Sequence, residues 1–167
     1  EQVSELTGGS LDLLINNAGV LLHNSLETVT PAEMITNFEV NAVGPLALTQ
    51  ALLPLLKASK CDIKLVANIS SGLGSIGHIP FEPPHFVSYR TSKAALNMIT
   101  KTLATNLARD HVVVIALRPA WTRTAIGGPN GRYSVTDCVA KLVSILSIVD
   151  MTKTGSFINW QGETGPW

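Results

Sequence analysis

The stretch LDLLINNAG at residues 11–19 decides the fold class of this chain. Its nearly continuous apolar run, Leu11–Asn16, is typical of a strand that is buried on both faces of a sheet. The asparagine and glycine residues that follow it favour a turn. In parallel sheets ligands bind beyond the carboxyl ends of the strands, so this turn marks one part of a candidate site.

Similar apolar runs recur along the chain and alternate with helical patterns. Strands are predicted at Ile63–Ile69, Val112–Leu117 and Ser156–Asn159. The predicted helices span 30–57, 88–109 and 134–149. This alternation predicts an α/β fold, a parallel sheet covered by helices. We find no internal repeat or linker, so residues 1–167 are expected to form a single domain.

Local signals refine two helices. Thr30, Pro31 and Glu33 form a predicted capping box that begins the first long helix. Gly44-Pro45 and Pro54 lie inside that helix, so we expect a kink near residue 44 or an early end near residue 53. The segment 1–9 is typical of the last turns of a helix with a glycine cap. We therefore expect the protein to begin upstream of residue 1.

Composition limits the classes of partner. The chain is 46% hydrophobic and 14% charged, with a formal net charge of +0 and a pI near 7.2. These values fit a buried-sheet domain, and they favour neither nucleic acid nor a membrane as a partner. Apolar stretches such as Ala51–Leu56 are shorter than a bilayer span. Cys61 and Cys138 fit reduced thiols of a cytoplasmic protein. The four histidines lack metal-ligand spacing, so no metal site is expected.

The clearest chemical pair is Tyr89 and Lys93. The chain has 2 tyrosines, and Tyr89 alone has a lysine four residues further on. Residues at this spacing share one face of a helix. A nearby ammonium lowers a phenol's pKa, and the phenol then suits general acid/base catalysis near neutral pH. An exposed helix pair without a function is the alternative interpretation of the same spacing.

Five motifs occur in an order that resembles the classical short-chain dehydrogenases/reductases, and the resemblance covers essentially the whole chain. They are Asn16–Gly19 after a strand, Asn41 in a helix, Asn68–Ser71 at a strand end, Tyr89 with Lys93, and Arg118–Thr124 after the third strand. The run YRTSKAALN at 89–97, Gly127-Gly128 and the C-terminal GETGPW are closest to the C-factor and sniffer-type carbonyl reductase branch.

The resemblance implies the C-terminal part of a Rossmann-like doubly wound domain in an NAD(P)-dependent oxidoreductase that interconverts a carbonyl and an alcohol. Tyr89 would exchange a proton with the substrate oxygen during hydride transfer. Lys93 would lower the pKa of Tyr89 and bind the nicotinamide ribose. Ser71 would hydrogen-bond the substrate oxygen, with Ser70 as the alternative. Asn41 would hold a water in a proton relay to Lys93.

The resemblance also implies a cofactor site and an assembly. The cofactor-binding residues would be Asn17, Ala18, Gly19, Tyr89, Lys93, Pro119, Thr122 and Thr124. The branch slightly favours NADP over NAD. The two long helices would pair with their symmetry mates, making a homodimer or a homotetramer. Each motif also has a plain structural interpretation, such as a turn for Asn17 and Gly19 or a surface helix position for Asn41.

The chain departs from the family pattern in three ways. Ala120 follows Pro119 where the family usually has glycine, which is tolerable if its φ stays negative. The segment 78–86 is an insertion with three prolines and two phenylalanines, and we expect it to shape the substrate pocket. No glycine-rich turn between a strand and a helix is present. We expect roughly 70 to 80 residues, about two and a half βα units, to precede this sequence in the complete protein.

Two other functions remain open at this point. A truncated, non-enzymatic relative could keep these motifs and act as a binding or interaction protein. An extended-type relative acting on nucleotide sugars also uses the Tyr-Lys pair, but it needs a larger C-terminal substrate domain than the residues after Tyr133 provide.

Overall fold

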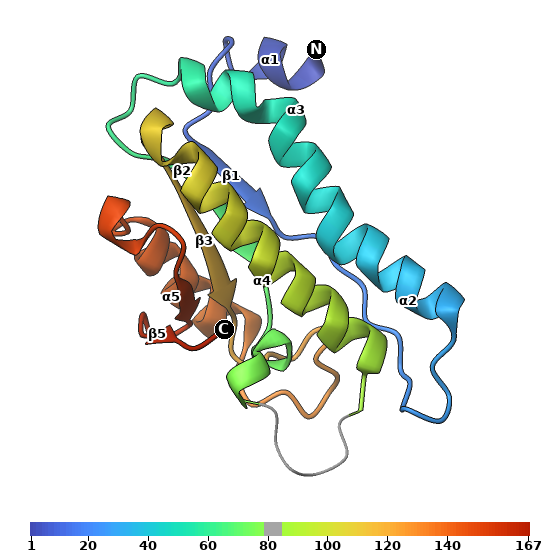
Figure 1. Ribbon diagram of the computed structural model, residues 1–167. Coiled ribbons are helices and arrows are strands. Elements are labelled where there is room, and N and C mark those ends of the chain that lie inside the picture. The colour runs from blue at the N-terminus through green and yellow to red at the C-terminus, as the bar shows by residue number, and fades with distance from the viewer. Residues whose placement is uncertain (79–84) are drawn as a thin grey trace.

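A five-stranded sheet in the order β1-β2-β3-β4-β5 forms the centre of the computed structural model, which describes residues 1–78 and 85–167 (Figure 1). Strands β1 (Leu13–Asn16), β2 (Lys64–Ile69), β3 (Val112–Arg118) and β4 (Phe157–Asn159) run parallel. The two-residue strand β5 (Thr164–Gly165) pairs antiparallel with β4. The predicted parallel sheet is confirmed, whereas β5 is too short to leave a periodic pattern in the sequence.

Helices cover both faces of this sheet. In Figure 1, α3 and α4 cross one face, and α5 lies behind the other. The helical elements are α1 (Gln2–Leu6), α2 (Pro31–Phe38), the π-helix η1 (Glu39–Val43), α3 (Gly44–Ala58), the 3₁₀ turns η2 (Gly72–Gly74) and η3 (Ile76–His78), α4 (Val87–Leu107), η4 (Ala108–Asp110), α5 (Val135–Leu146) and η5 (Met151–Lys153).

Alternate residues of the central strands build two hydrophobic clusters. On the α5 face, Leu65 and Ala67 of β2 pack with Val113 and Ile115 of β3 and with Ile145 of α5. On the opposite face, the cluster contains residues of β1, β2, β3, α3 and α4: Leu14, Val66, Val112, Val114, Leu56, Ala104 and Leu107. β3 is buried on both sides from Val112 to Leu117, as its uninterrupted apolar sequence predicts.

The first strand is not buried on both faces, which corrects the expectation from its sequence. Leu14 is buried against the α3 face, but Leu13 is 38% exposed and Ile15 is 44% exposed. Both lie in register with Leu65 and Ala67, on the face that α5 covers further along the sheet. β1 is the edge strand, and α5 does not extend over it.

The long helix from residue 31 to residue 58 is continuous but irregular. The capping box is present, since Thr30 Oγ1 accepts from Glu33 N at 3.3 Å and Glu33 Oε2 accepts from Thr30 N at 2.8 Å. Near residue 44, where a kink was one of the two alternatives, the helix contains a π-helical segment at Glu39–Val43. The early end predicted near residue 53 is wrong, because α3 continues through Pro54 to Ala58.

The helical run from residue 31 to residue 58 is both long and apolar. Together α2, η1 and α3 form a 28-residue helical run that is long and apolar enough to span a membrane by those criteria alone. Short apolar stretches in the sequence did not indicate such a length. Core helices and signal sequences meet the same criteria, and here one side of the run packs against the rest of the chain through the buried residues Asn37, Asn41 and Thr49.

Gly74 allows η2 to approach α4 closely. A Cβ at this position would lie 2.7 Å from Lys93 Cβ and 2.8 Å from Lys93 C. The second contact is with backbone, so the segments would have to separate. We predict that Gly74→Ala lowers the free energy of unfolding by about 1–3 kcal/mol, measured by denaturant or thermal unfolding. Gly165→Ala is the matched control, because a methyl group added there would meet no atom within 4 Å. Equal stability of the two variants would contradict this close approach.

Candidate active site

The helix α4 places Tyr89 and Lys93 on one buried face, at the carboxyl end of the sheet. Tyr89 is 6% exposed and Lys93 is 4% exposed. Lys93 Nζ lies 5.8 Å from the centre of the Tyr89 ring and donates a hydrogen bond to Ile69 O, at the end of β2, at 2.8 Å. The two side chains therefore share a face as their spacing predicts, and they do not form an exposed surface pair.

Burial dominates the ionisation of this pair. It raises the pKa of Tyr89, because the phenolate loses solvation, and the adjacent Ser71 hydroxyl only partly opposes this effect. Burial also lowers the pKa of Lys93 to about 8. Lys93 was expected to lower the Tyr89 pKa, but the net shift is upward: loss of solvation raises the pKa, and the Ser71 hydrogen bond is the contribution that lowers it. Tyr89 is consequently a protonated phenol at neutral pH.

The two serines after β2 have different surroundings. Ser70 is buried, and its Oγ donates to Asn97 Oδ1 at 2.6 Å. Ser71 lies beside Tyr89, and its Oγ accepts from Leu73 N at 3.1 Å. Accepting from Leu73 leaves the Ser71 proton free to be donated. The geometry therefore favours Ser71 over Ser70 as the serine that faces Tyr89.

Asn41 is fully buried in the π-helix, where its side chain binds the loop after β1. Its Oδ1 accepts from Val20 N at 2.9 Å, and its Nδ2 donates to Val20 O at 2.8 Å. Nδ2 also lies 3.0 Å from Ser92 Oγ of α4. The Asn41 side chain therefore connects the loop after β1 to α4.

A second asparagine–serine pair, which the motifs did not reveal, continues this contact. Asn37 is fully buried, and its Nδ2 donates to Ser88 Oγ at 3.2 Å. Asn37 and Asn41 are four residues apart, as are Ser88 and Ser92. The helical run 31–58 therefore binds α4 through two equivalent asparagine–serine hydrogen bonds, one helical turn apart. That shared spacing was visible in the sequence, but only the packing of α2 on α4 pairs the two sets.

A further polar row joins the strand ends to the helices beneath Tyr89. Asn16 Nδ2 donates to Asn68 Oδ1 at 2.7 Å and to Thr49 Oγ1 at 3.2 Å. Asn68 Nδ2 in turn donates to Thr100 Oγ1 of α4 at 2.9 Å. Asn16 and Asn68 thus tie β1, β2, α3 and α4 together, which is why polar side chains occupy the buried ends of apolar strands.

The loops after β1 and β3 present the predicted cofactor-binding residues at the same edge of the sheet. Asn17 and Ala18 are exposed directly after β1, and Pro119 is half-buried directly after β3. Thr122 Oγ1 donates to Ala120 O at 2.8 Å, and Thr124 Oγ1 accepts from Gly127 N at 3.0 Å. These two hydroxyls bind groups of their own loop and, within the described residues, form no hydrogen bond with Tyr89 or Lys93.

The surroundings of Gly19 fit a cofactor ribose against the backbone. A Cβ at Gly19 would lie 3.1 Å from Asn41 Oδ1 and 3.6 Å from Lys93 Nζ. Glycine therefore brings the chain after β1 directly beside the Lys93 ammonium. That ammonium carries three N–H donors, and Ile69 O is the acceptor it binds. The remaining donors suit hydroxyl groups such as those of a ribose.

The structure accommodates one departure from the family pattern, Ala120, and describes little of the other, the insertion at 78–86. Ala120 is not among the residues with positive φ, so alanine is accommodated where the family usually has glycine. The insertion at 78–86, expected to shape a substrate pocket, lies largely outside the described residues. Within 1–78 and 85–167, no three His, Cys, Asp or Glu side chains gather as they would around a metal ion.

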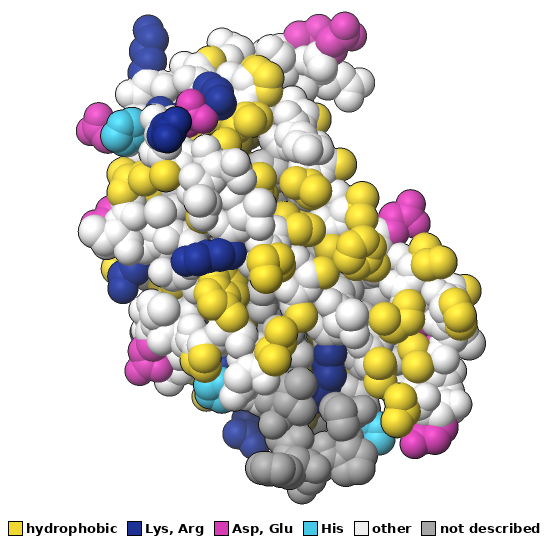
Figure 2. Space-filling view, in the orientation of Figure 1, with side chains coloured by type: hydrophobic (Ala, Val, Ile, Leu, Met, Phe, Trp, Pro, Cys, Tyr) yellow, Lys and Arg dark blue, Asp and Glu magenta, His cyan; other side chains and the backbone are white. Residues whose placement is uncertain are grey.

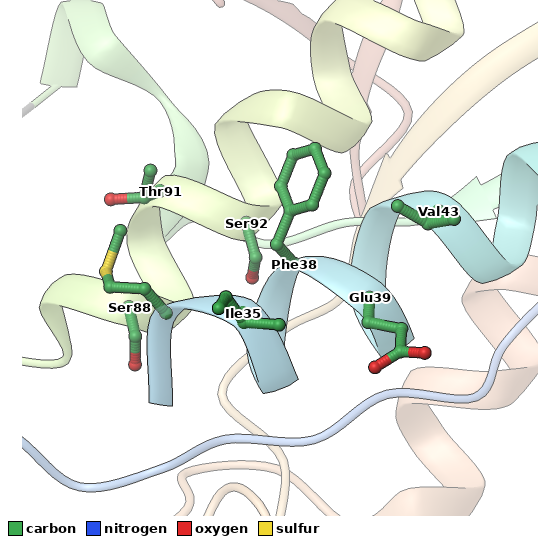
Figure 3. A pocket seen from close by; sticks show the side chains of 8 residues that line it. Ile35, Phe38, Glu39, Val43, Ser88, Thr91 and Ser92 are labelled. Atoms are coloured by element: carbon green, nitrogen blue, oxygen red, sulfur yellow. The ribbon is translucent and has the colours of Figure 1, made fainter. Parts of the chain in front are cut away.

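A separate groove of about 470 Å³ lies between α2 and α4, and we call it the α2–α4 groove (Figure 3). Figure 3 shows Ile35 and Phe38 on one side of this groove and Thr91 and Ser92 on the other. Tyr89, Lys93 and Ser71 do not line this groove. Half of the residues that line it are apolar and half are polar: Met34, Ile35, Phe38, Glu39, Val43, Ser88, Thr91 and Ser92.

Comparisons with known proteins agree with this geometry. A family model described as short chain dehydrogenase matches residues 1–132. The C-signal of Myxococcus xanthus is 36% identical over 160 residues, which are 95% of this chain and 94% of that protein. The NADPH-bound carbonyl reductase from chicken fatty liver is 34% identical with a TM-score of 0.92, covering 99% of this chain and 70% of that one. The carbonyl reductase Sniffer of D. melanogaster is 30% identical with a TM-score of 0.93, covering 99% and 71%.

Coverage differs among the relatives. The chain spans nearly the whole C-signal, but it spans only 56% and 65% of two longer short-chain dehydrogenases. The likeness to C-signal and to sniffer-type carbonyl reductases agrees with the branch expected from the sequence. With its parallel sheet, its Tyr89–Lys93 pair and these matches, the chain belongs to the short-chain dehydrogenase family.

Proposed function

We propose that this chain carries the catalytic part of an NAD(P)-dependent oxidoreductase that interconverts a carbonyl and an alcohol. The observation that carries the proposal is the buried Tyr89 hydroxyl, which lies beside Ser71 and on the same helix face as Lys93. A protonated phenol in this position can donate its proton to a carbonyl oxygen and recover it in the reverse reaction. The nicotinamide cofactor supplies or accepts the hydride when it is bound.

Ser71 and Lys93 assist Tyr89 in different ways. The free proton of Ser71 hydrogen-bonds the substrate oxygen, holding it within reach of the Tyr89 hydroxyl. The Lys93 ammonium stabilises the negative charge that develops on the phenol oxygen as its proton leaves. Its remaining N–H groups bind the ribose of the cofactor, beside the backbone of Asn17, Ala18 and Gly19. Pro119, Thr122 and Thr124 complete the cofactor contacts from the loop after β3.

Several finer assignments belong to this proposal. The chicken carbonyl reductase is described as NADPH-bound, which supports NADP over NAD as the cofactor here. The substrate is a small carbonyl or alcohol compound, and we expect the protein to act in the cytoplasm. Asn41 contributes by holding the loop at Val20 through two hydrogen bonds, and the relay water to Lys93 expected beside it belongs to the same proposal.

We also propose that the protein is a homodimer, or a tetramer built from that dimer, through the outer faces of α2, α3 and α4. Figure 2 shows hydrophobic side chains gathered over α2 and along α3. The exposed ones include Ile35, Phe38 and Leu48 of α2 and α3 and Met98 of α4. Leu52 and Leu53 of α3 instead pack against the core. Only some of the apolar side chains of α3 are therefore available to bind a partner.

A second candidate function is an interaction protein without catalysis. It is favoured by one observation, the match over 94% of a protein described as C-signal, which has nearly the same extent as this chain. The 167 residues contain no glycine-rich turn between a strand and a helix, so we expect them to bind NADPH weakly on their own. Micromolar NADPH binding in calorimetry on this chain would favour the enzyme and disfavour the interaction protein.

The role of Tyr89 is tested by removing its hydroxyl in an active form of the protein. We predict that Tyr89→Phe lowers kcat about 10²- to 10⁴-fold, because the transferable proton is lost while the ring remains. Cofactor affinity, measured by fluorescence titration, should stay within about twofold. Tyr133→Phe is the control, since Tyr133 is the other tyrosine and packs on Trp160 away from Lys93. Near wild-type turnover of Tyr89→Phe would rule out this mechanism.

The pH dependence follows from the shifted pKa values. Below about pH 8 the Lys93 ammonium is charged and Tyr89 is protonated, so both groups are ready for carbonyl reduction. As pH rises through the Lys93 pKa, the ammonium loses its charge and no longer stabilises the phenolate. We predict that kcat for reduction is level below about pH 8 and falls above it. In Lys93→Arg the fall should move to higher pH, because a guanidinium stays charged. A level profile to pH 10 would contradict the role of Lys93.

The assembly is tested by placing a charge on the exposed face. Leu48 is 44% exposed on α3, and we predict that Leu48→Glu converts the dimer into a monomer in light scattering at tens of micromolar protein. Ile148→Glu is the control, because Ile148 is 80% exposed and follows α5 on the opposite side of the sheet. A wild-type protein that is monomeric under these conditions would refute the proposed interface.

A further inference from the structure

The helix that carries Tyr89 begins without a capping side chain of its own. The residue before its first turn is Phe86, whose side chain has no polar atom and makes no capping hydrogen bond. Helix caps are usually Ser, Thr, Asp or Asn in an extended conformation. Phe86 instead has φ +64° and ψ +45°, a left-handed conformation that is unfavourable for a bulky residue. Another part of the chain must therefore stabilise this start.

Asn24, in the loop between β1 and α2, supplies the missing hydrogen bonds. Its backbone O accepts from Phe86 N at 2.7 Å, and its Oδ1 accepts from Ser88 N at 3.3 Å. Its Nδ2 donates to Ser88 Oγ at 2.7 Å. Asn24 is only 7% exposed, so these bonds compete little with water. Ser88 is the second residue of the helix, and its N–H is the kind of donor that a local cap would bind.

The position of Tyr89 in this helix makes the cap important. α4 begins at Val87, so Tyr89 is its third residue and lies in the first turn. The first hydrogen bond of the turn runs from Arg90 N to Phe86 O at 2.9 Å. First turns fray when their free N–H groups lack acceptors. Lys93, one turn further on, is held independently by Ile69 O.

We propose that Asn24 is a positioning residue that caps α4 from a distant loop and thereby holds the Tyr89 hydroxyl beside Ser71. Asn37 supports the same point, because its Nδ2 also donates to Ser88 Oγ. The catalytic consequence rests on the proposed function of Tyr89, whereas the capping itself does not. The two parts can therefore be tested separately.

The cap is tested by hydrogen exchange of the backbone amides in the 167-residue chain. In Asn24→Ala, exchange at residues 88–90 should become about 2- to 30-fold faster, the range expected for a lost cap, while residues 96–104 of the same helix keep their rates. Asn24→Asp should restore protection, because a carboxylate accepts the Ser88 N–H and suits a helix N-terminus. Asn106→Ala is the matched control, since the Asn106 side chain donates to Thr102 O near the other end of α4 and has no other hydrogen bond among the described residues.

Unchanged exchange at residues 88–90 in Asn24→Ala, or faster exchange spread evenly along α4, would overturn the cap. If Asn24→Ala does not fold, Asn24→Gln replaces it. The longer side chain keeps the amide but moves its acceptor away from Ser88 N, so the same local loss of protection is expected. Full protection in Asn24→Gln would equally count against the cap.

The effect on Tyr89 is read from its phenolate absorbance in a Tyr133→Phe background, where Tyr89 is the single tyrosine. After a rapid jump to alkaline pH, before global unfolding, Asn24→Ala should ionise at lower pH than the parent, because a frayed turn exposes the phenol to water. An unchanged ionisation would refute the link between the cap and Tyr89. In an active form of the protein, kcat should fall about 2- to 30-fold with KM for NADPH unchanged. If exchange and ionisation respond but no turnover depends on Tyr89, the cap holds and the proposed function fails.

Discussion

The buried ammonium of Lys93 is the constraint on which the site depends. A charge with only 4% of its side chain exposed is costly unless it has acceptors, and Ile69 O at the end of β2 provides one at 2.8 Å. This bond ties the face of α4 that carries Tyr89 to the edge of the sheet. It also requires close approaches, which glycine permits: Gly74 lies against the Lys93 backbone, and Gly19 lies beside its Nζ. The Tyr89 and Lys93 side chains therefore lie close to the backbone at Gly19 and Gly74.

Buried polar side chains extend this constraint through the domain. Asn37 and Asn41 bind Ser88 and Ser92 where α2 and η1 pack on α4. Asn16, Thr49, Asn68 and Thr100 connect the strand ends to α3 and α4. Such networks are stabilising only when their members are paired, because an unpaired buried polar group loses its solvation without compensation. Among the described residues, Asn16 Oδ1 is the one buried side-chain polar atom without a partner. Because hydrogen bonds are directional, these networks restrict the orientation of α4 in addition to its apolar packing.

The burial of Tyr89 and Lys93 explains why the pKa of Tyr89 is raised, although a lysine four residues away was expected to lower it. Two groups four residues apart on an exposed helix would interact mainly through their charges. Here both are enclosed, so loss of solvation raises the pKa of Tyr89 and lowers that of Lys93 to about 8. Both shifts favour the neutral forms. A phenol is protonated at neutral pH even without enclosure, and the upward shift keeps Tyr89 in that state, which the proposed donation to a substrate oxygen requires.

Local sequence alone was sufficient for the main strands and helices and for the family. Continuous apolar runs predicted β2 and β3, the Thr30–Glu33 capping box predicted the start of α2, and five motifs in order indicated short-chain dehydrogenases. These features depend on neighbouring residues or on motif order, which a sequence displays directly. Tertiary packing decided the rest: the exposed face of β1, which of Ser70 and Ser71 lies beside Tyr89, the direction of the Tyr89 pKa shift, and the cap that Asn24 places on α4. Each of these depends on solvation or on contacts between distant segments, and Asn24 and Ser88 become neighbours only when the chain has folded.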